Sequence, residues 1–149
     1  MTIEILLAMV SMSLFYGEVE LAGYLCLSFH CMLRTEEGLR LRVSDLTVAK
    51  GRIRLRIIGK SGNRFGTTED VVVEDQSVIS IILWLMKSKL PSQRIYTDNG
   101  FTFRRKWKWL VQALALDEAY QPYGLRRGGA TATFVETGSY DATCEKNVG

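Results

Sequence analysis

The sequence predicts an α+β fold that is mainly helical and carries a small three-stranded antiparallel sheet. Apolar residues recur with helical spacing toward both ends of the chain, whereas stretches within residues 46–73 alternate with a period of two. The composition is that of an ordinary globular protein, with 149 residues, 47% apolar, 23% charged and 2 prolines. We therefore interpret residues 1–149 as a single domain.

Six helices are predicted from apolar stripes and from the residues that start and stop helices. The second of them is apolar nearly all round, which places it at the centre of the core. Gly17 separates it from the first helix, Pro91 ends the fourth, and Pro122 precedes the last. The predicted helices are residues 3–14, 18–33, 34–42, 77–90, 102–114 and 125–136.

The sheet is predicted between the third and fourth helices. Over residues 52–58 three apolar residues alternate with three arginines, which is typical of a strand with one buried and one basic face. Residues 59–63 (Gly-Lys-Ser-Gly-Asn) have the composition of a turn, so residues 71–73 can return and pair with this strand. Residues 46–48 are predicted as a third strand, joined through Lys50-Gly51.

Basic residues are distributed unevenly along the chain. Residues 1–33 contain three glutamates and no lysine or arginine, so all 19 basic residues lie from Arg34 onward, together with 13 of the 16 acidic residues. That part of the chain carries a net charge of +6, which indicates a surface for an anionic partner. A solvated basic surface without a partner is the alternative interpretation.

Arginines within otherwise apolar segments are the candidate functional residues. Arg34 follows a run of core-like sequence, and Glu37 lies three residues later on the same helical face. Arg126 and Arg127 stand at the entrance of a helix rich in small residues. A buried guanidinium needs a carboxylate or a phosphate as its partner. Residue type alone favours a structural Arg34–Glu37 pair over a catalytic one.

Three segments, taken in order, resemble the catalytic domain of the tyrosine recombinases, the phage-integrase family. LRTEEGLRLRVSDL is similar to the first arginine box of that family, and GKSGNR is similar to the hairpin tip that presents a catalytic lysine. PYGLRRGGAT is similar to the second box, in a form seen in recombinases of eukaryotic mobile elements. The resemblance covers roughly residues 18–138 and implies an integrase-like catalytic core.

The resemblance implies DNA breaking and rejoining through a 3′-phosphotyrosyl intermediate, without a metal ion, a nucleotide or any other cofactor. Arg34 and Arg126 would stabilise the negative charge of the phosphorane, because guanidinium groups bind phosphate oxygens in pairs and stay charged. Lys60 would protonate the departing 5′ oxygen as general acid. Tyr123 would donate one hydrogen bond to the phosphate, and Glu37 would hold Arg34 in place.

The chain departs from the family pattern at two places that bear on activity. Tyr123 stands where the family usually has histidine. The nucleophilic tyrosine of the family lies further downstream than the 23 residues that follow Arg126, and Tyr140 comes too early to take its place. We therefore expect a catalytic domain that lacks the C-terminal nucleophile segment and the N-terminal core-binding domain, and that is inactive as an isolated chain.

Double-stranded DNA is the predicted partner, together with other recombinase protomers on that DNA. The candidate DNA contacts are the basic residues of the central strand and of the last two helices. They are Arg52, Arg54, Arg56, Arg104, Arg105, Lys106, Lys108 and Arg127. No membrane is expected, because no segment reaches the roughly 20 apolar residues that span a bilayer. The N-terminus lacks the basic region of a signal peptide, so we expect a nuclear or cytoplasmic protein.

Three other interpretations remain open at this point. The chain is compatible with a non-catalytic DNA-binding module that keeps the two phosphate-binding arginines, Arg34 and Arg126. It is also compatible with a fragment similar to a type IB topoisomerase, a class of enzyme with the same set of catalytic residues. An α+β interaction domain unrelated to DNA predicts instead that Arg34, Lys60 and Arg126 are scattered in space. The three cysteines have no metal-binding spacing, and no metal site is predicted.

Overall fold

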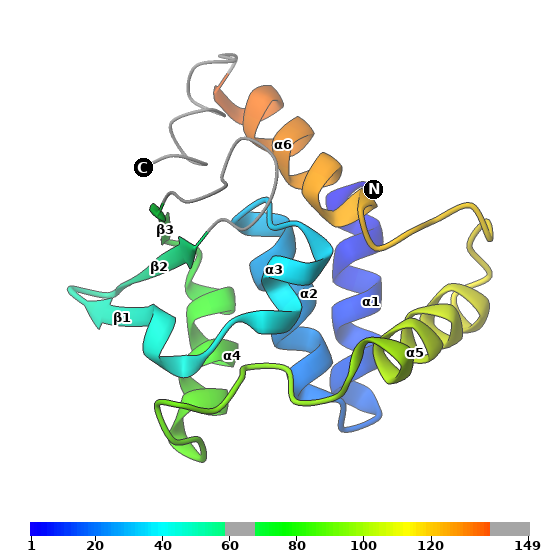
Figure 1. Cartoon of the computed structure of the whole chain (residues 1–149). Coiled ribbons are helices and arrows are strands. Elements are labelled where there is room, and N and C mark those ends of the chain that lie inside the picture. Colours follow the sequence, from blue (N-terminus) through cyan, green and yellow to red (C-terminus); the bar gives the residue numbers. More distant parts are fainter. Residues whose placement is uncertain (59–67, 138–149) are drawn as a thin grey trace.

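The computed structural model describes residues 1–58 and 68–137 of the chain (Figure 1). It has the predicted α+β architecture, in which helices surround one central helix and a three-stranded sheet lies at one side. The helices are α1 (Ile3–Phe15), α2 (Val19–His30), α3 (Thr35–Arg40), α4 (Gln76–Lys87), α5 (Gly100–Ala113) and α6 (Gly124–Thr137). The short 3-10 helix η1 (Val43–Asp45) leads into strands β1 (Leu46–Ala49), β2 (Arg52–Ile58) and β3 (Thr68–Val73).

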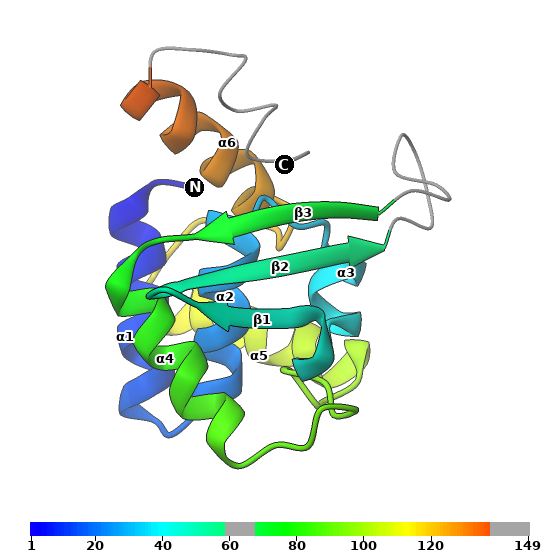
Figure 2. The ribbon, with the colours of Figure 1, turned by 90° about the vertical axis from the view of Figure 1, so that its left-hand side faces the viewer.

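The sheet confirms the predicted alternation. Its order is β1-β2-β3 with both pairs antiparallel (Figure 2). Leu55 of β2 lies opposite Leu46 of β1 and Val71 of β3. Ile53 and Leu55 are fully buried, so one face of β2 belongs to the core and the arginine face is exposed. Strand β3, predicted over residues 71–73, is longer than predicted and begins at Thr68.

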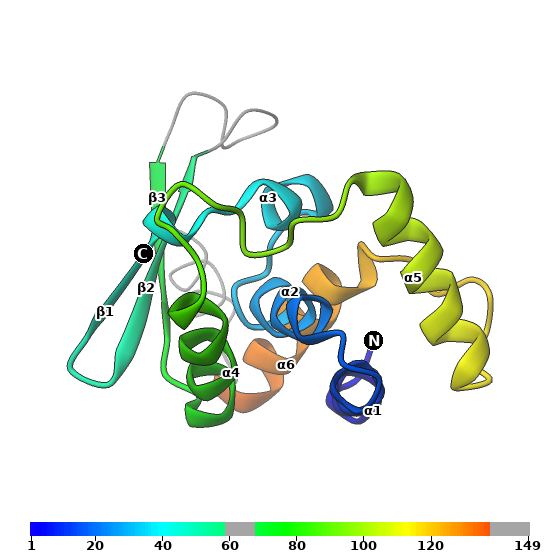
Figure 3. The same cartoon turned by 90° about the horizontal axis from the view of Figure 1, so that it is seen from below.

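Helix α2 is the centre of the core, as its apolar sequence predicts. Every residue from Leu21 to Phe29 is buried, and α1, α3, α4 and α6 all pack against it (Figure 3). Close packing with α3 depends on Gly38, because a Cβ there would lie 2.6 Å from the ring of Tyr24. Within the described residues, no helix combines the length and the apolar character needed to cross a bilayer.

Helix α2 ends at His30, three residues before the predicted end, because Met32 adopts a left-handed conformation with φ of 53°. The main-chain N–H of Leu33 donates to the carbonyl of Ser28 at 3.0 Å, which closes the helix as a Schellman motif. A left-handed methionine carries a strain that a glycine would not. The motif turns the chain sharply, so that Arg34 caps α3 directly afterwards.

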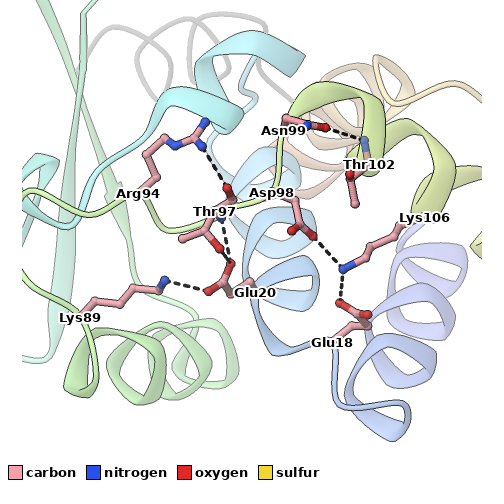
Figure 4. A network of polar contacts seen from close by, with 9 residues as sticks. All are labelled: Glu18, Glu20, Lys89, Arg94, Thr97, Asp98, Asn99, Thr102 and Lys106. Atoms are coloured by element: carbon pink, nitrogen blue, oxygen red, sulfur yellow. Dashed lines mark hydrogen bonds and ion pairs between the residues drawn. The ribbon is translucent and has the colours of Figure 1, made fainter.

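A network of polar contacts ties the segment between α4 and α5 to the start of α2 (Figure 4). The carboxylate of Glu20 accepts hydrogen bonds from Lys89 Nζ at 2.8 Å and from the Thr97 hydroxyl at 2.7 Å and main-chain N–H at 2.8 Å. Burial raises the pKa of Glu20, but the bonds from Lys89 and Thr97 outweigh burial and hold this pKa below its ordinary value of 4.5. The ionised carboxylate is therefore the form that stabilises this corner of the fold.

This lowered pKa makes stability depend on pH. The contribution of Glu20 is fully present above pH 4.5 and is lost as the pH falls through the lower pKa of the folded state. We expect Glu20→Gln to reduce the free energy of unfolding by about 1–2 kcal/mol at pH 7, and the difference from wild type to shrink below pH 4.5. Urea unfolding of both proteins at pH 7 and pH 3.5 measures this difference in the free energy of unfolding. Glu36→Gln, which removes an exposed carboxylate, is the matched control and should change little. A cost of Glu20→Gln that stays constant with pH would contradict this account.

Candidate functional site

Arg34 is positioned by the end of α2 and the start of α3. It is the N-cap residue of α3, and Glu37 at the third helical position accepts its main-chain N–H at 2.8 Å through Oε1. The other oxygen, Oε2, lies 3.8 Å from Arg34 Nη1. The predicted spacing of three residues thus places both side chains on the same side of α3.

Arg126 reaches the same place from the first turn of α6. Its Nη1 donates to the carbonyl of Met32 at 3.1 Å, and it lies 3.9 Å from Glu37 Oε1. The left-handed turn at Met32 and the second arginine are therefore directly connected. Sequence reasoning assigned Glu37 to Arg34 alone and missed both Arg126 and the Met32 carbonyl as partners.

Two adjacent glycines allow α6 to approach the end of α2 so closely. A Cβ on Gly129 would lie 1.9 Å from the carbonyl oxygen of Phe29, and a Cβ on Gly128 would lie 2.9 Å from the Phe29 ring. Both glycines are buried. Their absence of side chains sets the depth at which α6 packs, and this depth decides whether Arg126 reaches Glu37.

Arg34, Arg126 and Glu37 together carry one net positive charge in a partly buried setting. The Glu37 side chain is 6% exposed, whereas those of Arg34 and Arg126 are 28% and 18% exposed. The Glu37 carboxylate lies within ion-pair distance of both guanidinium groups and so holds both in place. The arrangement can therefore present two oriented guanidinium groups to an anion at the surface.

Of the two other predicted catalytic residues, Tyr123 and Lys60, the structure describes Tyr123. Tyr123 lies on the loop before α6 and is 52% exposed. Lys60 lies outside the described residues, and so does Tyr140. Among the described residues, no group of three or more histidine, cysteine or acidic side chains is arranged to hold a metal ion.

The arginines of β2 occupy the exposed face of the sheet, as the alternation predicts. Arg52 lies 3.5 Å from Glu74 and Arg56 lies 4.0 Å from Asp70, and both arginines remain more than half exposed. Arg54 is exposed between them. Such exposed ion pairs contribute little and open readily, so these residues are accessible to a partner.

Helix α5 and the start of α6 present a second group of exposed basic residues. Arg104, Arg105 and Lys108 are exposed on α5, and Arg104 lies 3.6 Å from Glu36 next to the start of α3. Arg127 is exposed on the first turn of α6. All four residues are exposed, as expected for residues that could contact a partner.

Lys106 has a different environment from the DNA contact that the sequence suggested. Its Nζ is bonded to Glu18 at 2.8 Å and to Asp98 at 2.7 Å, and its side chain is 24% exposed (Figure 4). Burial works against the charged form, but the bonds to Asp98 and Glu18 outweigh it and raise the pKa of Lys106. Its charge has two acidic partners within the fold, which sets it apart from the other basic residues of α5.

The comparison with solved structures found complexes of a site-specific recombinase with its substrate. The chain is similar to the crystal structure of XerH site-specific recombinase bound to difH substrate in a pre-cleavage complex, with a TM-score of 0.75, 14% identity and coverage of 98% of this chain and 46% of that chain. It is also similar to XerH bound to palindromic difH substrate in a post-cleavage complex, with a TM-score of 0.75, 15% identity and coverage of 99% and 45%.

The sequence comparisons gave no match, since no family model and no curated protein matches this chain significantly. The chain spans less than half the length of the XerH chains. At this low identity the likeness concerns the fold and not the activity. The chain has a tyrosine recombinase-like fold.

Proposed function

We propose that this chain holds a DNA phosphodiester between Arg34 and Arg126, as the phosphate-binding part of a tyrosine recombinase catalytic domain. The observation that carries the proposal is the meeting of these two arginines on Glu37, from segments far apart in the sequence. The recombinase-like fold supports it, because the two segments resemble the two arginine boxes of that family. The form of residues 125–131 (LRRGGAT) further supports an origin in a mobile element and a role in DNA integration.

In the proposed reaction a tyrosine hydroxyl loses its proton to water, and its oxygen attacks the phosphorus of the DNA backbone and forms a phosphotyrosyl bond. The bond from phosphorus to the 5′ oxygen breaks, and Lys60 gives that oxygen a proton. Arg34 and Arg126 neutralise the charge that develops on the non-bridging oxygens, which is where fixed donors lower the barrier most. Glu37 acts as a positioning residue for both arginines, and Tyr123 donates one hydrogen bond.

The basic surface around the site supports a polyanionic partner, and we propose a location in the nucleus or the cytoplasm for the protein. The exposed basic residues of β2, α5 and α6 would contact phosphates on both sides of the held phosphodiester. These residues are Arg52, Arg54, Arg56, Arg104, Arg105, Lys108 and Arg127. Binding through phosphates predicts an affinity that is largely independent of sequence and falls steeply with salt.

The test of this proposal is duplex binding by Arg34→Gln and Arg126→Gln. We expect each variant to bind about tenfold more weakly, because a charge-assisted bond to phosphate is lost, and to reduce the slope of log affinity against log salt by about one. Fluorescence anisotropy at several salt concentrations measures both quantities. Lys87→Gln removes one exposed charge from α4 and should leave both unchanged. Equal affinity and slope in all three variants and wild type would overturn the proposal.

A denaturing gel with labelled nicked duplex tests whether this chain itself supplies the nucleophile. We expect no covalent adduct from these 149 residues, because Tyr140 is the one tyrosine after Arg126 in them and lies 14 residues beyond it. In the proposed reaction the attacking tyrosine therefore comes from outside these residues or from another molecule. An adduct that disappears in Tyr140→Phe would make Tyr140 the nucleophile instead.

A further inference from the structure

A pocket of about 580 Å³ lies beside Glu37, on the side of α3 that faces the sheet. It brings together arginines from three separate segments. Arg40 is the last residue of α3 and Arg42 follows that helix, whereas Arg56 belongs to β2 and Arg94 to the segment before α5. The acidic residues that line it are Glu37 and Asp45. Sequence reasoning assigned a role to Arg56 alone among these arginines.

Arg42 and Arg94 face one another across an isolated antiparallel bridge. Two main-chain bonds hold the segments together, from Val43 N–H to the Gln93 carbonyl and from Ile95 N–H to the Leu41 carbonyl, both at 2.9 Å. Side chains directly opposite in such a bridge lie close together on one face, and like charges in that position destabilise the pair. The bridge therefore brings two arginine positions, 42 and 94, to the same pocket from separate segments.

Main-chain carbonyls orient three of the four guanidinium groups. Arg42 Nη1 donates to the Ser92 carbonyl, Arg94 Nη2 donates to the Thr97 carbonyl at 2.9 Å, and Arg40 Nε donates to the Glu36 carbonyl at 3.2 Å. A carbonyl carries no net charge, so these bonds fix the direction of each guanidinium without neutralising it. Oriented and charged guanidinium groups are the usual means of binding phosphate.

The two carboxylates of the pocket do not balance the four arginines. Glu37 also serves Arg34 and Arg126, and Asp45 Oδ2 accepts the main-chain N–H of Arg42 at 2.9 Å. Arg56 lies 4.0 Å from Asp70 outside the pocket lining and is 65% exposed, which is a weak pairing. The pocket therefore keeps a net positive charge.

We propose that this arginine pocket binds a phosphate group, separate from the one held by Arg34 and Arg126. Two sources share that chemistry: a backbone phosphate of the same DNA strand, and a free phosphate in solution. The first source rests on the proposed function, because the pocket and the candidate site share Glu37 as a wall. The binding of a phosphate group as such does not depend on it.

The first part of the test uses inorganic phosphate as the probe, at constant ionic strength with chloride as the balancing ion. We expect phosphate to raise the Tm of the wild-type chain and Arg40→Gln to lose at least half of that shift. Arg40 suits the test because it is exposed and, among the described residues, its side chain donates to a carbonyl of its own helix. Arg94→Gln is the second variant, and Lys87→Gln is the control that should keep the full shift.

The second part measures duplex binding by Arg40→Gln against salt. A slope reduced by about one identifies a DNA phosphate as the occupant, and an unchanged slope with a lost phosphate shift identifies free phosphate. A variant that keeps both the phosphate shift and the slope overturns the proposal. Failure of the proposed function is distinguishable, because duplex affinity would then be insensitive to Arg34→Gln and Arg126→Gln while the phosphate shift persists.

Discussion

Replacing Gly129 by alanine is expected to destabilise the fold by about 3 kcal/mol or more, the upper range for an overpacked core. The new Cβ would lie 1.9 Å from the carbonyl oxygen of Phe29, which is backbone and cannot rotate away as a side chain can. Helix α6 must therefore move outward from α2. This movement withdraws Arg126 from the Met32 carbonyl and from Glu37. Chemical denaturation measures the stability, and duplex anisotropy measures the accompanying loss of DNA affinity.

Gly124→Ala is the matched control for this substitution. Gly124 begins the same helix, and a Cβ there would meet no atom within 4 Å. Alanine in a helix is favoured over glycine, so this variant should be unchanged or more stable by up to about 1 kcal/mol. Similar losses in both variants would show that the close contact with Phe29 does not control the packing of α6.

Replacing Glu37 by alanine is expected to reduce the free energy of unfolding by about 2–3 kcal/mol. The substitution removes the acceptor of the Arg34 main-chain N–H and leaves two partly buried guanidinium groups without their shared carboxylate. Glu37→Gln should cost less, because an amide oxygen can still accept the N–H. Urea unfolding orders the three proteins as wild type, Glu37→Gln and Glu37→Ala.

The Glu37 variants also report on the anion site. An added phosphate should stabilise Glu37→Gln more than wild type, because it replaces the missing negative charge between the two arginines. Glu36→Gln, one residue earlier and 62% exposed at the side chain, controls for the general effect of losing a carboxylate. A Glu37→Gln protein as stable as wild type, with no added response to phosphate, would contradict the shared role of this residue.

Local sequence patterns were sufficient for the helices, for the sheet and for the Arg34–Glu37 pair. The alternation in residues 52–58 sets which side of β2 is buried, and a spacing of three residues sets the pair on α3. The end of α2 was misplaced because the left-handed residue is Met32. Sequence rules expect glycine at that position.

Contacts made by distant segments could not be predicted in the same way. The approach of Arg126 to Glu37 depends on how α6 packs on α2, and the bridge between Arg42 and Arg94 joins two segments without regular structure. Lys106 was grouped with its basic neighbours, whereas the structure places it between two acidic residues. It lies three residues after Phe103 and four before Leu110, which places it at the edge of the buried stripe of α5, facing Glu18.

A crystal structure of this chain with a short duplex shows directly whether Arg34 and Arg126 hold a DNA phosphate. We expect one phosphate within hydrogen-bond distance of the guanidinium groups of both arginines, with Glu37 still behind them. A duplex bound on another face, with no phosphate at this pair of arginines, would contradict this expectation.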